Sequence, residues 1–470
     1  MKKKTKIIAT LSDKNCTVDF ITDLYNAGMD IVRINTAHAS FDGAIKIIET
    51  VRKVSDKIAI LIDTKGPEIR TTYADNAINV KAGDIIKIKG DALQKSSKDF
   101  LYVSYNKFVD DVPVGCKILI DDGVIELIAK EKKDDYLLCE VQNSGDIYGK
   151  KSINIPSTHI KLPALSKKDI DFINFACDNN LDFIAHSFVR KKEDIIAVQA
   201  ILDSRGSDIK IISKIENHEG VKNIDEIIDY SYGIMVARGD LAIEISAEKL
   251  PIVQKNIISK CIEKRKPVIV ATQMLYSMIQ NPRPTRAEVS DIANAIFEGT
   301  DAIMLSGETA NGKYPVESVK VMTKIANEVE TNILLFKNLD YFKQTTDISA
   351  YLVKTAVKSS EDLNVRAIIA DTYTGRTIRN LSAYRPKCNI FVQCYNKATM
   401  RELALSFGVY ADYMKPQPTS HEFIQEAIDD LLKQYNFKPD DFITIIAGNF
   451  GPSKGASYIE IEQIEHLTNK

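Results

Sequence analysis

Short apolar runs rich in Ile and Val recur along this chain, and amphipathic stretches separate them. Such runs indicate parallel strands that are buried on both faces, with helices between them. Stretches such as KKDIDFINFACDNN and KLPIVQKNIISKCIEKRK have the spacing of amphipathic helices. Eight units of this kind predict a closed (β/α)8 TIM barrel. The eight predicted strands are residues 6–11, 30–35, 58–63, 182–188, 209–215, 233–237, 267–272 and 302–306.

The interval between the third and fourth runs has a different pattern. Short alternating segments (DIIKIKG, CKILID, GVIELIAK and YLLCEVQ) are separated by the turn sequences AGD, PVG and DDG. This pattern predicts a small all-β domain inserted into the barrel. A long insertion at a strand-end loop costs little closure entropy, and it can serve as a lid.

The pattern changes again near residue 340. The segments RAIIAD, NIFVQC and FITIIAG alternate with helical stretches, which predicts a C-terminal open α/β sheet. We therefore expect three domains: a barrel formed by residues 1–66 and 162–338, a β lid at 67–161, and a C-terminal α/β domain at 339–470.

Composition narrows the class of protein. Hydrophobic residues make up 44% and charged residues 27%, which are ordinary values for a globular enzyme. Lys and Arg number 62 against 64 Asp and Glu, so no basic excess points to nucleic acid or a membrane surface. No apolar stretch approaches the roughly 20 residues that span a bilayer. The seven scattered cysteines form no C-x-x-C, which favours a reducing cytoplasm and gives no support to structural zinc.

Polar residues gather at the predicted strand ends, where (β/α)8 barrels carry their chemistry. Six of the eight strands end in charged or hydroxyl-bearing residues, whereas a merely solvated surface would scatter them. In chain order these residues and their neighbours are Arg33, Asn35, Asp63, Thr64, Lys65, Lys214, Glu216, Arg238, Gly239, Asp240, Thr272, Gln273, Ser306 and Glu308.

Lys214 and Glu216 are two residues apart, so on a strand they point to the same side. Glu216 and Asp240 follow adjacent strands and could share one hard cation, Mg²⁺ or Mn²⁺. With Arg33 and Lys214 as fixed positive charges, the set is suited to phosphoryl transfer. The alternative is a structural salt-bridge network among the same four residues, and it stays open at this point.

Other signals are weaker. In GDIYGKKS the first glycine is four residues before Gly149 where a phosphate-binding Walker loop has five, and Lys151 stands where Ser or Thr should follow the lysine. We interpret His186 as a packed barrel residue, since it has no visible partner in the sequence. Thr285 and Glu288 have the spacing of a helix capping box.

The motifs resemble those of one family, the pyruvate kinases. The resemblance rests on LIDTKGPEIRT, IISKIENHEG, IMVARGDLAIEI and VIVATQMLYSMIQNPRPTRAEVSDIANAIFEGTDAIMLSGETANGKYPVES, in that order. It implies the architecture predicted above, with transfer of a phosphoryl group from phosphoenolpyruvate to ADP and release of pyruvate and ATP in glycolysis. It also implies a homotetramer.

The resemblance also implies roles for single residues. Lys214 would stabilise the transferring phosphoryl group, and Arg33 would contact its oxygens. Gly239 and Thr272 would bind the carboxylate end of the substrate. The enolate would be protonated through Thr272 or through a water chain near Ser306 and Glu308. The residues implied for substrate binding are Arg33, Lys214, Gly239, Asp240 and Thr272, and those for Mg²⁺ are Glu216 and Asp240.

By the same resemblance, Thr10, His38, Arg70 and Lys151 would face the nucleotide. The chain has TLSDKNCT where the family usually has TIGPAS, so this loop departs from the family beyond Thr10.

A monovalent cation, usually K⁺, is implied at Asn35, Asp63 and Thr64. Glu68 is the residue type that accompanies K⁺ dependence in the family. Ala37 stands where a serine commonly lends a hydroxyl, so we expect weaker K⁺ binding.

In the last domain, DTYTGRT resembles the family's loop for a phosphorylated small-molecule effector. Hydroxyls, backbone N–H groups and one guanidinium make a plausible phosphate nest. The alternative is an ordinary strand-to-helix turn. The residues concerned are Thr372, Thr374, Gly375, Arg376 and Thr377.

Two other functions stay open on the sequence. One is a non-catalytic sensor of a phosphorylated metabolite on the same fold. The other is a Mg²⁺-dependent lyase or aldolase acting on pyruvate enolate. Joint retention of Lys214, Glu216, Asp240, Arg33 and Thr272 argues against the sensor, and the inserted and C-terminal domains argue against the lyase.

Overall fold

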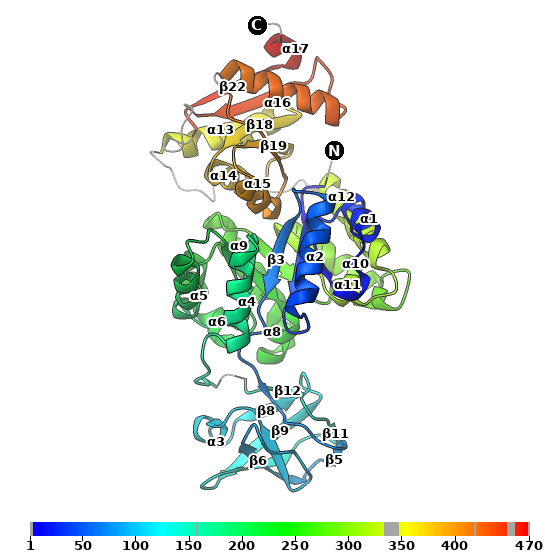
Figure 1. Cartoon of the computed structure of the whole chain (residues 1–470), viewed down its shortest axis with the longest axis vertical. Helices are drawn as coiled ribbons and strands as arrows, with labels where there is room; N and C mark the ends of the chain where they lie inside the picture. Colours follow the sequence, from blue (N-terminus) through cyan, green and yellow to red (C-terminus); the bar gives the residue numbers. More distant parts are fainter. Residues whose placement is uncertain (1–2, 157, 333–346, 418–419, 449–455, 469–470) are drawn as a thin grey trace.

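The computed structural model describes residues 3–156, 158–332, 347–417, 420–448 and 456–468. Three bodies follow one another along the long axis of the molecule, with the barrel in the middle, the lid at one end and the C-terminal domain at the other (Figure 1). The predicted boundary between barrel and C-terminal domain, at residues 338 and 339, lies outside the described residues.

The central body is a closed barrel of eight parallel strands, which confirms the predicted fold class. Inside it, residues such as Leu61, Ala185 and Ile212 pack together. Their neighbours along the strands, such as Ile60 and Ile184, pack outward against the helices. The strands are β1 (Lys6–Leu11), β2 (Ile31–Asn35), β3 (Ala59–Asp63), β13 (Phe183–His186), β14 (Lys210–Ile215), β15 (Gly233–Ala237), β16 (Val268–Ala271) and β17 (Ala302–Leu305).

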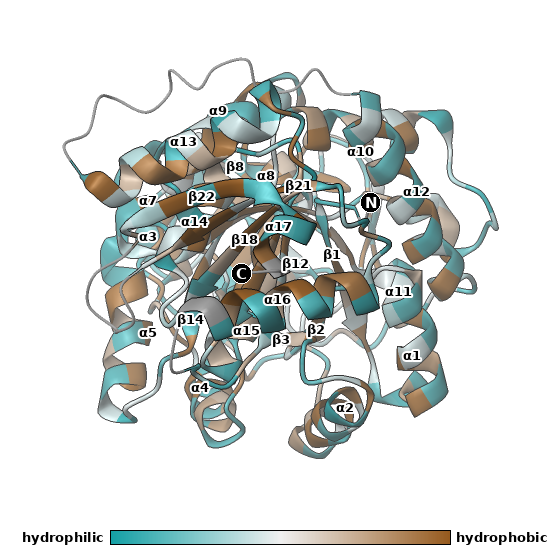
Figure 2. Cartoon of the chain, turned by 90° about the horizontal axis from the view of Figure 1, so that it is seen from above, coloured by the Kyte–Doolittle hydropathy of each residue, from teal (hydrophilic) through white to brown (hydrophobic). Residues whose placement is uncertain are grey.

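Helices ring the barrel, and Figure 2 shows that helices such as α2 have one hydrophobic and one hydrophilic side. Thr285 and Glu288 form the predicted capping box at the start of α10. The barrel helices are α1 (Val18–Ala27), α2 (Phe41–Val54), α4 (Lys167–Asp178), α5 (Lys192–Ser204), α6 (His218–Lys222), α7 (Ile224–Tyr230), α8 (Arg238–Glu244), α9 (Leu250–Glu263), α10 (Arg286–Phe297), α11 (Gly307–Ala310) and α12 (Pro315–Asn332).

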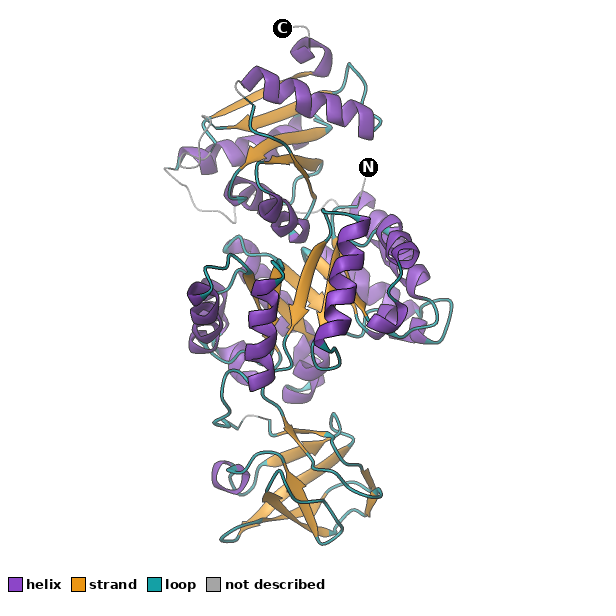
Figure 3. Ribbon diagram, in the orientation of Figure 1, coloured by secondary structure: helices purple, strands orange, loops and turns teal. Residues whose placement is uncertain are grey.

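The lid is inserted between β3 and β13 and consists almost entirely of strands (Figure 3), as predicted. It has a hydrophobic core of its own, which includes Phe108 and Leu127. Its elements are β4 (Ile69–Arg70), β5 (Ile78–Val80), β6 (Ile85–Gly90), β7 (Phe100–Val103), α3 (Phe108–Asp111), β8 (Lys117–Ile120), β9 (Ile125–Lys132), β10 (Leu137–Val141), β11 (Gly145–Ile147) and β12 (Ser152–Asn154).

The C-terminal domain is an open five-stranded sheet in the order β20-β19-β18-β21-β22, with β22 antiparallel at one edge. The sequence predicted three of these strands and missed β20 and β22. The strands are β18 (Ala367–Thr372), β19 (Asn389–Cys394), β20 (Val409–Tyr413), β21 (Phe442–Ala447) and β22 (Tyr458–Gln463). The helices are α13 (Ile348–Asp362), α14 (Arg376–Ala383), α15 (Lys397–Glu402), α16 (Ser420–Gln434) and α17 (Ile464–Thr468).

Candidate active site

A buried charge network lies at the C-terminal rim of the barrel. Lys214 follows Ile212 by two residues on β14, so its side chain continues the row that points into the barrel. The Lys214 ammonium lies 3.0 Å from Asp63 Oδ1 and 2.9 Å from Glu216 Oε1. Arg33 donates from Nε to Asp63 Oδ2 at 2.6 Å. The structure therefore brings two cations and two carboxylates from three strand ends together.

Burial and charge compete at this network. Burial by itself would lower the pKa of Lys214, but Asp63 and Glu216 outweigh it and hold that pKa above its usual value. At Asp63, burial by itself would raise the pKa of the carboxyl, but Arg33 and Lys214 hold that pKa below its usual value. The lysine is thus kept positively charged in a site from which water is largely excluded, where a fixed charge acts most strongly.

Glu216 and Asp240 fit a hard divalent cation in their donor chemistry. Burial raises the pKa of Glu216 to about 7, Lys214 opposes the rise, and the nearby Asp240 carboxylate adds to it. Burial also raises the pKa of Asp240. Two carboxylates that repel one another in a buried rim are stabilised by a bound cation, and Mg²⁺ takes one or two carboxylates plus water or substrate oxygens. In the described part of the chain, no cluster of three or more His, Cys, Asp or Glu side chains is placed to hold a metal.

Thr272 and Gly239 meet at the neighbouring rim position. The Gly239 N–H donates to Thr272 Oγ1 at 2.7 Å, and Arg238 donates to the Thr272 carbonyl at 2.8 Å. Thr272 has a φ of +72°, an unusual conformation for a β-branched residue, which fits a functional position. Ser306 lies at the end of β17, and its N–H donates to the buried carboxylate of Glu308 at 2.8 Å.

The residues expected at the nucleotide fall into two groups. Thr10 belongs to the rim, because its hydroxyl accepts from Arg33 at 3.0 Å. His38 is exposed just after β2, and its backbone N–H donates to the Asn35 carbonyl. Arg70 and Lys151 lie on the lid. Arg70 is on β4 and Lys151 directly precedes β12, and these two strands pair with each other.

Both of these lid cations form ion pairs with acidic residues of the lid. Arg70 Nε lies 2.8 Å from Glu68 Oε1, and Lys151 Nζ lies 2.9 Å from Asp121 Oδ1. The structure does not join Arg70 or Lys151 to the rim network by any hydrogen bond or ion pair among the described residues.

The unusual TLSDKNCT loop forms a short 3-10 turn at Asp13–Asn15. Lys46 donates to the Asp13 carbonyl at 3.0 Å, and Ser12 Oγ donates to the Ala310 carbonyl at 3.1 Å. These contacts fix the loop without the glycine and proline of the family sequence.

The oxygens expected to hold a monovalent cation already accept hydrogen bonds. Asn35 Oδ1 accepts from the Ala37 N–H at 3.1 Å, and the Thr64 carbonyl accepts from Ser187 Oγ at 2.6 Å. The Asp63 carboxylate accepts hydrogen bonds from both Arg33 and Lys214. The ligand types fit K⁺, but a bound K⁺ would share each of these oxygens with an internal donor.

Sequence reasoning missed two rim residues, both directly after β13. Ser187 Oγ accepts from the Lys214 ammonium at 2.7 Å. The Phe188 N–H donates to Glu216 Oε2 at 2.6 Å, and Phe188 has a φ of +55°. Both lie in the predicted strand 182–188, and a search of every strand end for hydroxyl groups finds Ser187.

Comparison with known proteins decides the family. Residues 2–319 match the family model described as "Pyruvate kinase, barrel domain", and residues 351–462 match "Pyruvate kinase, alpha/beta domain". The chain belongs to the pyruvate kinase family.

Curated pyruvate kinases from several bacteria are similar over nearly the whole chain. The protein from Borreliella burgdorferi is 48% identical over 99% of this chain and 98% of its own length. Those from Bacillus licheniformis and Geobacillus stearothermophilus are each 41% identical over 100% of this chain and 82% of their own length.

The effector loop predicted from the pyruvate kinase resemblance joins β18 to α14. Gly375 has a φ of +74°, and its N–H donates to the buried Thr372 Oγ1 at 2.9 Å. Arg376 begins α14 and is exposed, while Thr374 is exposed beside it. The turn thus presents one guanidinium and one hydroxyl to solvent.

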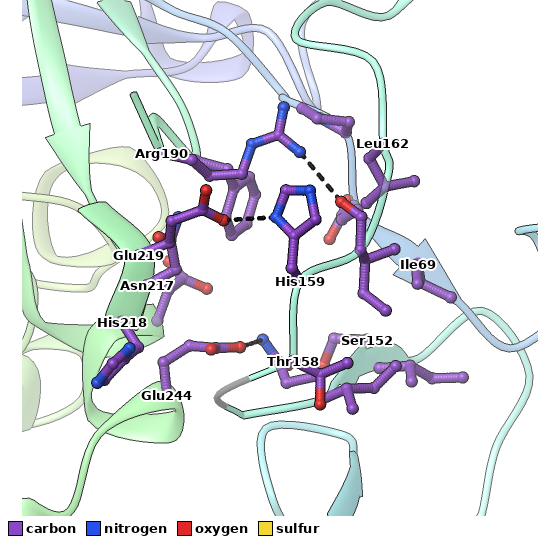
Figure 4. A pocket seen from close by; sticks show the side chains of 18 of the residues that line it. Ile69, Ser152, Thr158, His159, Leu162, Arg190, Asn217, His218, Glu219 and Glu244 are labelled. Carbon is purple, nitrogen blue, oxygen red and sulfur yellow. Dashed lines mark hydrogen bonds and ion pairs between the residues drawn. The ribbon is translucent and has the colours of Figure 1, made fainter. Parts of the chain in front are cut away.

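A cavity of about 450 Å³ separates the lid from the barrel on the side of β14 and β15 (Figure 4). Its walls combine apolar side chains with carboxylates and cations. The lining includes Glu68, Ile69, Asn154, His159, Phe188, Arg190, Glu219, Asp240 and Glu244.

Proposed function

We propose that this member of the pyruvate kinase family transfers the phosphoryl group of phosphoenolpyruvate to ADP, giving pyruvate and ATP in glycolysis. The observation that carries the proposal is the buried Lys214 ammonium, held charged by Asp63 and Glu216 at the barrel rim beside Arg33. Phosphoryl transfer needs positioned positive charge more than covalent chemistry, and this rim supplies it.

We also propose roles for single residues, and their places at the rim support them. Lys214 and Arg33 would neutralise charge on the transferring phosphoryl group. The substrate carboxylate would lie against the Gly239 N–H end of α8, with Thr272 beside it. Thr272 and Ser306 stand at neighbouring strand ends, from which a proton can reach the enolate carbon.

Mg²⁺ or Mn²⁺ would be held by Glu216 and Asp240, and when bound it supplies positive charge against the phosphoryl and enolate oxygens. K⁺ at Asn35, Asp63 and Thr64 is proposed with reduced affinity, because Ala37 lacks a hydroxyl. The nucleotide would be held by Thr10 and His38 from the barrel and by Arg70 and Lys151 from the lid.

We extend the proposal to the regulation, oligomeric state and cellular compartment of the enzyme. The loop Thr372–Thr377 would take a phosphorylated effector, and the protein would work as a homotetramer in the cytoplasm. Free thiols at all seven cysteines fit a reducing compartment. No helix in the described ranges is both long and apolar enough to cross a membrane.

A lactate dehydrogenase-coupled assay with phosphoenolpyruvate, ADP and Mg²⁺, run with and without K⁺, tests the function. We expect pyruvate formation that depends on ADP and on the divalent cation. Binding of phosphometabolites without turnover would indicate a sensor. Pyruvate-enolate chemistry without ATP formation would indicate a lyase or aldolase.

A further inference from the structure

The segment that returns from the lid to the barrel is fastened to the barrel beside the cavity of Figure 4. Asn154 Nδ2 donates to Glu244 Oε1 at 3.1 Å. His159 Nδ1 lies 2.9 Å from Glu219 Oε2, and Arg190 donates to the Ile160 carbonyl at 3.2 Å. Figure 4 shows the His159–Glu219 contact near the centre of the view and Glu244 below it.

The Glu244 contact reaches an element that also carries a proposed metal ligand. α8 follows β15 without a loop and spans only Arg238–Glu244. Asp240 and Glu244 are four residues apart on this helix, so they lie on the same face, one turn apart. Both line the cavity. The contact at Glu244 therefore acts on the same short helix that carries Asp240.

The Glu244 carboxyl is held by its contact with Asn154. Glu244 is only partly exposed, and burial raises the pKa of its carboxyl, with the Asn154 amide opposing the rise. A hydrogen bond from a neutral amide stabilises a buried carboxylate and fixes its direction.

We infer that Glu244 is a positioning residue, which couples the lid, through Asn154 on β12, to the orientation of Asp240 and so to divalent-cation binding. The inference rests on the proposed metal role of Asp240. Partners that orient metal-binding carboxylates typically change metal affinity when they are removed, although they do not touch the metal. The contact gives the lid a direct mechanical link to the metal site.

Binding of Mn²⁺ alone tests the inference without turnover. Free Mn²⁺ is counted by electron paramagnetic resonance in the full-length enzyme without substrates. We expect Glu244→Ala and Asn154→Ala each to weaken Mn²⁺ binding by up to about tenfold. Because both remove the same hydrogen bond, the double variant should be no weaker than the worse single variant. Glu244→Gln keeps an acceptor for the Asn154 amide, so this variant should retain most of the wild-type affinity for Mn²⁺.

Asn79→Ala is the matched control, because Asn79 donates to Asp146 at 2.9 Å within the lid, in the two-stranded β5–β11 sheet. It removes the same kind of bond and should leave Mn²⁺ affinity unchanged. Amide hydrogen exchange of residues 152–155 should become faster in Glu244→Ala and stay unchanged in Asn79→Ala.

Two outcomes distinguish a failure of this inference from a failure of the metal role proposed for Asp240. Unchanged Mn²⁺ affinity in both Glu244→Ala and Asn154→Ala, with Asp240→Asn weakened, overturns the coupling alone. Unchanged affinity in Asp240→Asn overturns the metal assignment and the coupling with it. Additive losses in the double variant also contradict a shared hydrogen bond.

Discussion

Lys214 is the residue on which phosphoryl transfer should depend most. Replacing it with Met keeps a side chain of similar length but removes the positive charge that faces the transferring phosphoryl group. We expect Lys214→Met to lower kcat for pyruvate formation by about 10²- to 10³-fold, since one preorganised electrostatic contact is worth about that much. Enolisation of pyruvate, measured as exchange of its methyl protons with solvent, should survive in part.

The control for this variant is Lys210→Met, at the start of the same strand and away from the rim. It should transfer phosphoryl groups at nearly the normal rate. Thermal melting of both variants checks folding, because Lys214→Met leaves Asp63 and Glu216 buried without their shared cation. Near-normal transfer by a folded Lys214→Met enzyme would rule out the assigned role.

His186 shows a different use of a polar residue, on β13, the strand next to β14. It is completely buried, and neither ring nitrogen has a hydrogen-bond partner among the described residues. Burial lowers its pKa to about 4, although Asp194 and Asp169 oppose the shift. This agrees with the interpretation of His186 as a packed barrel residue, carried at a cost in stability.

The His186 pKa gives a pH dependence with a defined sign. Unfolded histidine titrates near 6.5, so below that pH the unfolded chain binds a proton that the folded chain rejects. His186 should therefore cost the fold up to about 3 kcal/mol as pH falls from 6.5 to 4. His186→Leu should be more stable by about 1–3 kcal/mol at pH 7.

Denaturant unfolding of wild type and His186→Leu at several pH values measures this. The difference between the two proteins isolates His186 from the other groups that titrate in the window. If that difference stays constant between pH 7 and pH 4.5, the lowered pKa is wrong.

The β18–α14 turn carries the effector proposal. Arg376→Ala removes the exposed guanidinium of the turn, so we expect loss of activation by phosphorylated effectors with little change in the unactivated rate. Rates at subsaturating phosphoenolpyruvate, measured over an effector series such as sugar phosphates and nucleotides, test this. Lys387→Ala, which removes an exposed cation elsewhere in the domain, should respond normally. An unchanged response in Arg376→Ala would favour the ordinary turn.

Barrel strands were predictable because both of their faces are buried and their sequences are nearly continuous apolar runs. The rim residues followed from them, since the end of a strand such as β14 fixes where Lys214 and Glu216 stand. β22 was missed because YIEIEQ is half-buried throughout and lies at an antiparallel edge, away from the βα rhythm. Lid-to-barrel contacts such as Asn154–Glu244 join segments ninety residues apart in the chain, and no local pattern encodes them.

The opposite end of the barrel carries a second polar layer that the sequence did not reveal. Asp182, which the sequence placed at the start of a predicted strand, and Asp301, which it did not single out, each accept from the backbone of a neighbouring strand. Each also accepts an arginine of the C-terminal domain, Arg401 for Asp182 and Arg385 for Asp301. The face remote from catalysis thus serves to attach the C-terminal domain, the usual division of labour between the two ends of such a barrel.

Arg385 and Asp301 should hold the two domains together most strongly. Their side chains are only 2% and 4% exposed, and the guanidinium donates to both carboxylate oxygens, at 3.0 and 2.7 Å. Removing one partner of a buried pair leaves an uncompensated charge, which typically costs about 3–5 kcal/mol. Arg385→Met should therefore loosen the C-terminal domain from the barrel and lower the urea midpoint of the first unfolding transition.

Arg366→Met provides the comparison, because its partner Asp441 belongs to the same domain and the pair is partly exposed, so its loss should cost less than about 1 kcal/mol. Far-ultraviolet circular dichroism follows the unfolding, since the chain has no tryptophan. Multidomain chains need not unfold in one step, so the midpoints of separate transitions are compared rather than a single free energy. Equal midpoint shifts in the two variants would show that the buried pair does not control domain attachment. A larger shift in Arg385→Met alone would place the attachment at Asp301, at the foot of the strand that leads to Ser306.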